Sequence, residues 1–174
     1  LLRLPEMFAV DPWGHTTYDS LYTVFCRDIR DYGLRFEGNR VWIYPDLDDG
    51  KEVAFWHLTT RGTSVKPVPR RKMKFQLKGT LRQDSGERLP DFRRCERLPW
   101  VNPLIRKNAP EHILSWDYDE GDGVVKTYVW AHEEQFVVIM KRYDDGSRRL
   151  ITSFYIDYEN KRADLQRKYD SRIV

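Results

Sequence analysis

Three Asp-Gly dipeptides divide this chain of 174 residues, at Asp49-Gly50, Asp122-Gly123 and Asp145-Gly146. Asp-Gly readily supplies the positive φ angles that a tight β-hairpin turn requires. The segments on either side of each dipeptide are rich in Val, Ile, Phe, Tyr and Trp, as β-strands usually are. The sequence therefore predicts a sheet built from hairpins, with strands at 40–44, 51–59, 113–118, 124–130, 135–142 and 148–158.

Helical patterns are confined to the two ends of the chain. Leu21, Val24, Phe25 and Ile29 recur at helical spacing, which predicts a helix from Thr17 or Asp19 to about residue 31, ended by Gly33. A second, amphipathic helix is predicted at 159–171. The last three strands should form an antiparallel meander, with the unbroken apolar run 136–140 as the central strand. We therefore expect a single α+β domain over residues 1–174, with both helices packed on an antiparallel sheet.

Composition supports a packed domain: the chain is 40% hydrophobic and 14% aromatic. The segment 62–88 has few large apolar residues, and we expect a loop or mobile arm there. The longest apolar run has five residues, far short of a membrane span, so no membrane partner is expected. No secretory signal is evident, and the two cysteines, Cys26 and Cys95, are too few for a disulfide framework. These features favour a soluble, cytoplasmic protein.

Basic residues are distributed unevenly, although the net charge is only +3. No acidic residue lies between Glu52 and Asp84, and eight Lys and Arg residues fall in that interval. Such a stretch is typical of proteins that bind a polyanion, and RNA or DNA is the obvious one, although a solvated loop would show the same charge. The predicted RNA-binding residues are Arg61, Arg70, Arg71, Lys72, Lys74, Arg94 and Arg97.

The sequence gives no sign of a zinc site or a cofactor, and a turn explains each cluster of Asp and Glu, although such a cluster can also bind magnesium. No two of the four histidines are spaced i, i+4, and no Cys-x-x-Cys occurs. The acidic stretch from Asp117 does not fit a calcium loop, because its twelfth position is Tyr128 rather than Glu. A glycine-rich phosphate loop and a G-x-S-x-G elbow are also absent from the sequence, which argues against ATP-driven and triad chemistry.

The remaining candidates suit metal-free RNA cleavage, which needs a base, an acid and donors or cations for the phosphate. In a strand at 51–59, His57 would share a face with Thr59, close to the start of the basic stretch. In the last strand, Ile151, Ser153 and Tyr155 would share one face, opposite Thr152. Packing explains several of these residues equally well. The candidate catalytic residues are His57, Lys126, Thr152, Ser153 and Tyr155.

The order of four sequence segments, FWHLTT, KTYVW, FVVIMKRY and RRLITSFYIDYENKR, resembles the superfamily of metal-independent ribonucleases that includes RelE, barnase, EndoU and colicins D and E. The similarity spans roughly residues 51–172 and is greatest to toxins of phages and mobile elements. It implies an α+β fold and RNA cleavage by attack of the 2′-hydroxyl. His57 would be the general acid or base, Lys126 a phosphate-binding cation, Thr152 or Ser153 the hydroxyl of the last strand, and Tyr155 an auxiliary donor.

Three functions follow as hypotheses. The first is an endoribonuclease toxin that cuts tRNA or mRNA without a cofactor and is held in check by a cognate antitoxin or immunity protein. The second is a non-catalytic nucleic-acid-binding regulator, which would share the basic surface but would not need His57. The third is a protein-interaction domain, such as an antitoxin or inhibitor, whose charged segments face a protein partner.

Overall fold

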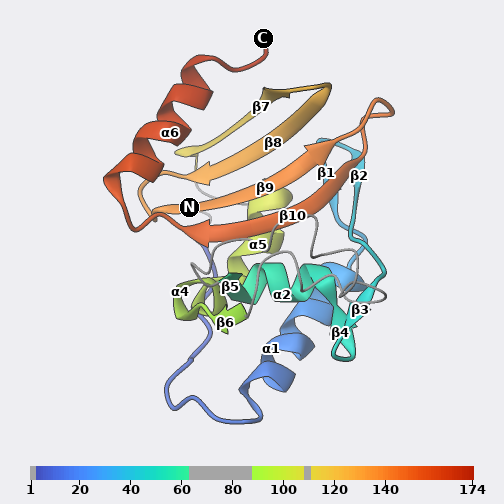
Figure 1. The fold of residues 1–174 in the computed structure, drawn as a ribbon, viewed down its shortest axis with the longest axis vertical. Helices are drawn as coiled ribbons and strands as arrows, with labels where there is room; N and C mark the ends of the chain where they lie inside the picture. Colours follow the sequence, from blue (N-terminus) through green and yellow to red (C-terminus); the bar gives the residue numbers. More distant parts are fainter. Residues whose placement is uncertain (1–2, 63–87, 108–110) are drawn as a thin grey trace, which may run out of the picture.

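The computed structural model describes residues 3–62, 88–107 and 111–174, and its architecture is α+β, as predicted (Figure 1). Its largest sheet has six strands in the order β1-β2-β10-β9-β8-β7. Strands β7 to β10 pair with one another in sequence order, and all three pairings are antiparallel. The strands are β1 Arg35–Phe36, β2 Asn39–Trp42, β7 Ile113–Gly121, β8 Val124–Ala131, β9 Phe136–Arg142 and β10 Arg148–Tyr155.

The sheet is mixed rather than purely antiparallel, which corrects the prediction. β2 pairs in parallel with the first two residues of β10, and β1 then pairs with β2 in a short hairpin. The turn at Asp49-Gly50 does form a hairpin, but its strands are only β3 Leu47–Asp48 and β4 Lys51–Glu52. Both residues of Asp49-Gly50 and of Asp122-Gly123 have positive φ angles, as the turn chemistry requires.

Both predicted end helices are present. The first comprises α1, Thr17–Phe25, continued by a π-helical turn η1, Cys26–Arg30, and Gly33 follows with a φ of 75°. The second is α6, Glu159–Asp170. The central strand is also as expected: all five residues of the run 136–140 in β9 are buried.

The segment predicted as a strand at 51–59 is instead mostly helix α2, Val53–Thr59. Its buried residues include Ala54, Phe55, Leu58 and Thr59, which lie on one face at helical spacing. Phe55 is enclosed by the rings of aromatic neighbours, several of them in α1. The β-rich composition was misleading because this packing outweighs the strand preference of individual residues.

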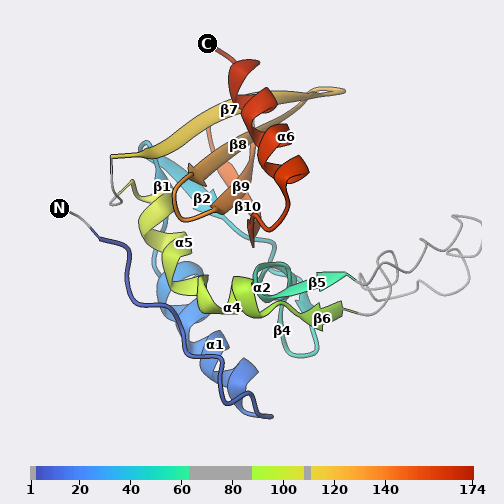
Figure 2. The ribbon, with the colours of Figure 1, turned by 90° about the vertical axis from the view of Figure 1, so that its left-hand side faces the viewer.

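The helices cover the two faces of the sheet unequally (Figure 2). Helices α1, α2 and α5, Leu98–Ile105, form the larger core with the face that carries Val129, Val138 and Met140. The short helix α4, Phe92–Glu96, places Cys95 in the same core. Helix α6 forms a second core on the opposite face, where Leu165 packs with Trp116, Tyr128 and Trp130.

A β-bulge interrupts the alternation of β10 between Leu150 and Thr152. Before the bulge Leu150 is paired with Met140, and after it Ser153 is paired with Val138, so both residues share the face of the larger core. The predicted faces of this strand, with Leu150 opposite Ser153, are therefore wrong. A bulge inserts one residue and reverses the alternation beyond it, which sequence periodicity cannot show.

The ends of the predicted arm at 62–88 are paired with each other. Strands β5, Thr60–Gly62, and β6, Arg88–Pro90, form an antiparallel pair directly after α2. The rest of that segment lies outside the described residues. The pairing fixes the position at which the basic stretch leaves and rejoins the domain, beside the end of α2.

The helical form of residues 53–59 predicts that Phe55→Ala and Leu58→Ala both destabilise the protein. Both side chains are fully buried, and truncation costs about 2–5 kcal/mol of unfolding free energy per buried residue of this size. Urea denaturation followed by circular dichroism measures both values. Leu47→Ala is the control, because Leu47 is 63% exposed and should change stability by less than about 0.5 kcal/mol. A nearly neutral Leu58→Ala would contradict the helix, since only a strand would separate these two residues onto opposite faces.

Candidate active site

His57 lies near the C-terminal end of α2 and borders a cavity of about 490 Å³. The imidazole is half-buried. Within residues 3–62, 88–107 and 111–174, neither of its ring nitrogens hydrogen-bonds to another protein group. Its nitrogens are therefore available to a ligand in the cavity. The cavity is lined by Tyr44, Asp46, Val53, Ala54, His57, Arg149, Leu150 and Ile151.

Arg94 and Thr152 fix the backbone of His57 in place. Arg94 Nη1 donates to the carbonyl oxygens of His57, at 2.9 Å, and of Thr60, at 2.8 Å. The Thr152 hydroxyl donates to the same His57 oxygen at 3.0 Å. Carbonyl groups at a helix C-terminus lack intrahelical partners and carry partial negative charge, so a guanidinium stabilises them well. Helices α2 and α4 and strand β10 therefore meet at one carbonyl group.

Helix α4 holds the end of α2 through two further contacts. The Cys95 thiol donates to the Thr59 carbonyl at 3.2 Å, and the backbone N–H of Asp91 donates to the same oxygen at 2.9 Å. The Asp91 carboxylate also lies 3.3 Å from Arg94 Nε, an ion pair without hydrogen-bond alignment. Burial raises the pKa of the Cys95 thiol to about 12, so this cysteine is a structural thiol rather than a nucleophile.

The electrostatic environment keeps His57 unprotonated at neutral pH. Burial lowers the pKa of its imidazole to about 4, and the positive charges of Arg88, Arg94 and Arg149 add to this effect. At pH 7 the imidazole is therefore neutral, which is the form that can accept a proton. The arginines thus place positive charges beside a neutral base. The negative charge of a phosphate group in the cavity would offset these positive charges.

Aromatic side chains surround Arg149 at the mouth of the cavity. The Arg149 guanidinium lies 4.1 Å from the centre of the Tyr44 ring, and its Nε donates to the Tyr143 hydroxyl at 3.0 Å. Trp42 contacts both tyrosine rings, at centroid distances of 5.6 and 5.4 Å. Tyr44 is 44% exposed. A cation among partly exposed aromatic rings is a common surface for nucleic-acid bases and phosphates.

Tyr155, a further predicted catalytic residue, lies at a separate cavity of about 350 Å³ near the end of β10. Its hydroxyl donates to Gln135 Oε1 at 2.6 Å. The guanidinium groups of Arg93 and Arg97 lie 5.0 and 4.6 Å from the centre of its ring. Tyr155 is therefore separate from the His57 cavity, and its hydroxyl and ring are engaged in contacts within the protein.

Two other predicted catalytic residues are not at the cavity. Ser153 is fully buried, and its hydroxyl has no hydrogen-bond partner within the described parts of the chain, so it cannot contact RNA in this conformation. Lys126 is not among the residues that line the cavity, and it lies on β8, which β9 separates from β10. The structure thus does not place Lys126 beside His57, where the resemblance would have it as the phosphate-binding cation.

The predicted RNA-binding arginines differ in how far their side chains are exposed. Arg61 in β5 is exposed, and it stays a prediction. Arg97 is 7% exposed and Arg94 has 16% of its side chain exposed, so both serve mainly inside the fold. Their contacts with carbonyl groups and rings could not be inferred from charge alone. Four further predictions, Arg70, Arg71, Lys72 and Lys74, lie outside the described residues.

Sequence reasoning missed Arg149, Arg88 and Tyr44. The sequence did contain a signal for Arg149, because this residue stands directly before the apolar strand residues in the RRLITSFY segment. Arg88, whose Nε donates to the Thr60 hydroxyl at 2.8 Å, had none, since only the pairing of β5 with β6 brings it beside α2.

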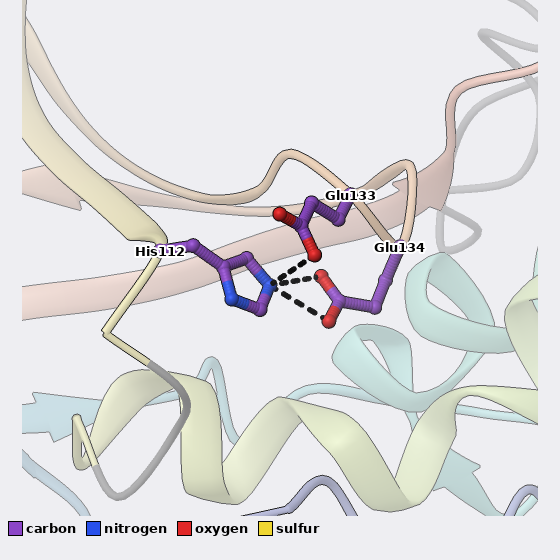
Figure 3. Close-up of side chains that lie close together, drawn as sticks. All are labelled: His112, Glu133 and Glu134. Carbon is purple, nitrogen blue, oxygen red and sulfur yellow. Dashed lines mark hydrogen bonds and ion pairs between the residues drawn. The ribbon is translucent and has the colours of Figure 1, made fainter.

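Among the described residues, one group of side chains could hold a metal ion, although the sequence predicted none. His112, Glu133 and Glu134 place their ligand atoms within 4.8 Å of one another (Figure 3). No histidine spacing signalled this group, because strand pairing rather than a helix brings its members together. It shares no residue with the lining of the His57 cavity.

Comparisons with protein-family models, curated proteins and solved structures found no match. Among the helices of the described residues, none is both long and apolar enough to cross a membrane. The site's own geometry therefore carries the functional argument.

The His57 environment predicts a titration midpoint near pH 4, measured from its imidazole NMR signals. Arg149→Met should raise that midpoint, since removing a nearby positive charge favours the imidazolium. Arg27→Met is the control, because Arg27 is an exposed residue paired with Asp28.

The ordinary histidine pKa in an unfolded chain is about 6.5. The folded state therefore binds fewer protons, and the stability due to His57 is complete above about pH 6.5 and is lost as the pH falls toward 4. A midpoint near 6.5 that Arg149→Met leaves unchanged would contradict this electrostatic account.

Proposed function

We propose that this protein is a metal-independent endoribonuclease whose active site is the His57 cavity. One observation carries the proposal: an unprotonated imidazole with free ring nitrogens borders a cavity, and arginine side chains surround it. A base beside cations supplies two of the three elements that RNA cleavage by the 2′-hydroxyl needs, and water serves as the acid. The resemblance of the RRLITSFY segment to the last strand of metal-independent ribonucleases supports a role for Thr152, whereas FWHLTT lies in helix α2 rather than in the strand that the resemblance implied, so the case for His57 rests on the cavity.

In the proposed reaction His57 accepts the proton of the ribose 2′-hydroxyl. The 2′-oxygen then bonds to the adjacent phosphorus, and the bond from phosphorus to the 5′-oxygen breaks. The leaving 5′-oxygen takes a proton from water, the resulting hydroxide takes back the proton held by His57, and the products are a 2′,3′-cyclic phosphate and a 5′-hydroxyl. Arg149 stabilises the added negative charge on the phosphate, because its guanidinium lines the cavity. Arg94 and Thr152 are positioning residues that hold the His57 backbone.

The aromatic surface beside the cavity binds the parts of the substrate that flank the reacting phosphate. Trp42, Tyr44 and Tyr143 offer aromatic rings on which unpaired bases can stack beside Arg149. Arg61 is exposed at the start of the basic stretch and can contact the phosphate backbone. Such a site favours single-stranded or loop segments, as in tRNA or mRNA. A cognate antitoxin or immunity protein would inhibit the enzyme by presenting acidic side chains to this cavity.

The proposal predicts that the purified protein cuts a tRNA pool or total RNA in excess EDTA and leaves 2′,3′-cyclic phosphate ends. His57→Ala should lower kcat by about 100- to 10,000-fold, the usual contribution of a general base. His15→Ala is the matched control, since His15 is an exposed histidine in another part of the chain. Gel electrophoresis with end-group analysis measures both rate and product.

A substrate with a single 2′-deoxyribose at the cleaved position tests the nucleophile. It should resist cleavage at that position and still bind. Cleavage of the deoxy substrate, or equal activity in His57→Ala, would refute the mechanism. Salt-sensitive RNA binding without any cleavage would instead favour the non-catalytic regulator, and failure to bind nucleic acid at low salt would favour the protein-interaction domain.

A further inference from the structure

The strand pairing of β7 with β8 brings one imidazole and two carboxylates together at one end of the sheet. His112 directly precedes β7, and Glu133 and Glu134 lie in the turn between β8 and β9. The pair Ile113 and Ala131 is the last in the β7–β8 ladder on this side. The residues just beyond that pair therefore face each other across the strand ends, and Figure 3 shows both carboxylates directed at the same ring nitrogen.

The distances within this group suit a shared ligand. His112 Nε2 forms hydrogen bonds of 2.8 Å with both carboxylate oxygens of Glu134 and lies 3.9 Å from Glu133 Oε2. A metal ion bound at about 2.0–2.2 Å from each ligand atom holds adjacent ligand atoms at separations of this order. The three groups are accessible without being fully exposed: His112 and Glu134 retain 30% and 24% of their side-chain exposure, and Glu133 retains 71%.

The charges of the group are unbalanced without a cation. Two consecutive glutamates bring their carboxylates to one imidazole, Glu134 in direct contact and the more exposed Glu133 at 3.9 Å. Within the described residues, neither carboxylate forms an ion pair with a lysine or an arginine. A protonated His112 would balance only one of the two negative charges. A divalent cation would balance both and would leave the imidazole neutral as a ligand.

We propose that His112, Glu133 and Glu134 bind a divalent transition-metal ion, for which Zn²⁺ is the best match. One imidazole nitrogen with carboxylate oxygens is a donor set that zinc accepts, and hard ions such as Mg²⁺ and Ca²⁺ prefer oxygen alone. Water completes the coordination. The bound ion joins the start of β7 to the β8–β9 turn and so stabilises this end of the sheet. The site is separate from the His57 cavity and does not depend on the proposed ribonuclease activity.

The test is isothermal titration of the chelator-treated, dialysed protein with Zn²⁺ at pH 7.5. We expect one ion per chain and a thermal unfolding midpoint that rises with free zinc, because the ion binds the folded state. His112→Gln and Glu134→Gln should each weaken binding by about tenfold or more, and Glu133→Gln should weaken it less. Co²⁺ absorption spectra report the ligand geometry directly.

His15→Gln is the matched control, since it removes an exposed imidazole outside the group. It should leave zinc affinity and the thermal shift unchanged. Absence of zinc binding by wild-type protein would refute the site, and so would binding that persists unchanged in His112→Gln and Glu134→Gln. Each variant is first checked for an unchanged circular dichroism spectrum without metal. Because no RNA is used, failure of this proposal is separate from failure of the ribonuclease proposal.

Discussion

The guanidinium of Arg94 at the C-terminal end of α2 is the interaction on which the site depends. It donates to two carbonyl groups, those of His57 and Thr60, at the end of a seven-residue helix. Isolated helices of that length are not stable in water, so tertiary contacts must supply the stability. Arg94 supplies them from α4, and Thr152 adds a hydrogen bond from β10 to the same His57 oxygen. Burial removes water from the Arg94 guanidinium, and the end of the helix leaves carbonyl groups without partners. The hydrogen bonds between them offset both costs.

This arrangement has an electrostatic consequence for His57. Burial disfavours a positive charge on the imidazole, and the cations that secure the end of α2 and line the cavity act in the same direction. Arg94 and Arg88 thus add to the effect of burial on the protonation state of the candidate base, besides their structural role. A negatively charged ligand would reverse the effect, since it would offset the guanidinium charges and favour the imidazolium. Ligand binding and proton uptake at His57 are therefore expected to be coupled.

Local signals in the sequence were sufficient for much of the fold. The Asp-Gly turns located the strand pairs of 113–155, and helical spacing located α1 and α6. Three features depended on packing between distant segments. Residues 53–59 form a helix because Phe55 and Leu58 fill the core together. The bulge at residue 151 reverses the faces of β10 and buries Ser153. Arg94 and Arg97, which charge alone assigned to RNA, are mainly occupied within the protein. The His112 group, by contrast, lies across the ends of the consecutive strands β7 and β8.

The most direct test of the account is an NMR titration of His57 with a short oligonucleotide that carries 2′-deoxyribose and cannot be cleaved. Imidazole signals of the free and bound protein are followed from pH 4 to 8 at low salt, and His57→Gln assigns the resonance. The account predicts that His57 signals shift on binding and that the His57 pKa rises from about 4, because a phosphate offsets the nearby arginines. Oligonucleotide binding that leaves both the His57 signals and the His57 pKa unchanged would contradict it and would place the nucleic-acid surface elsewhere.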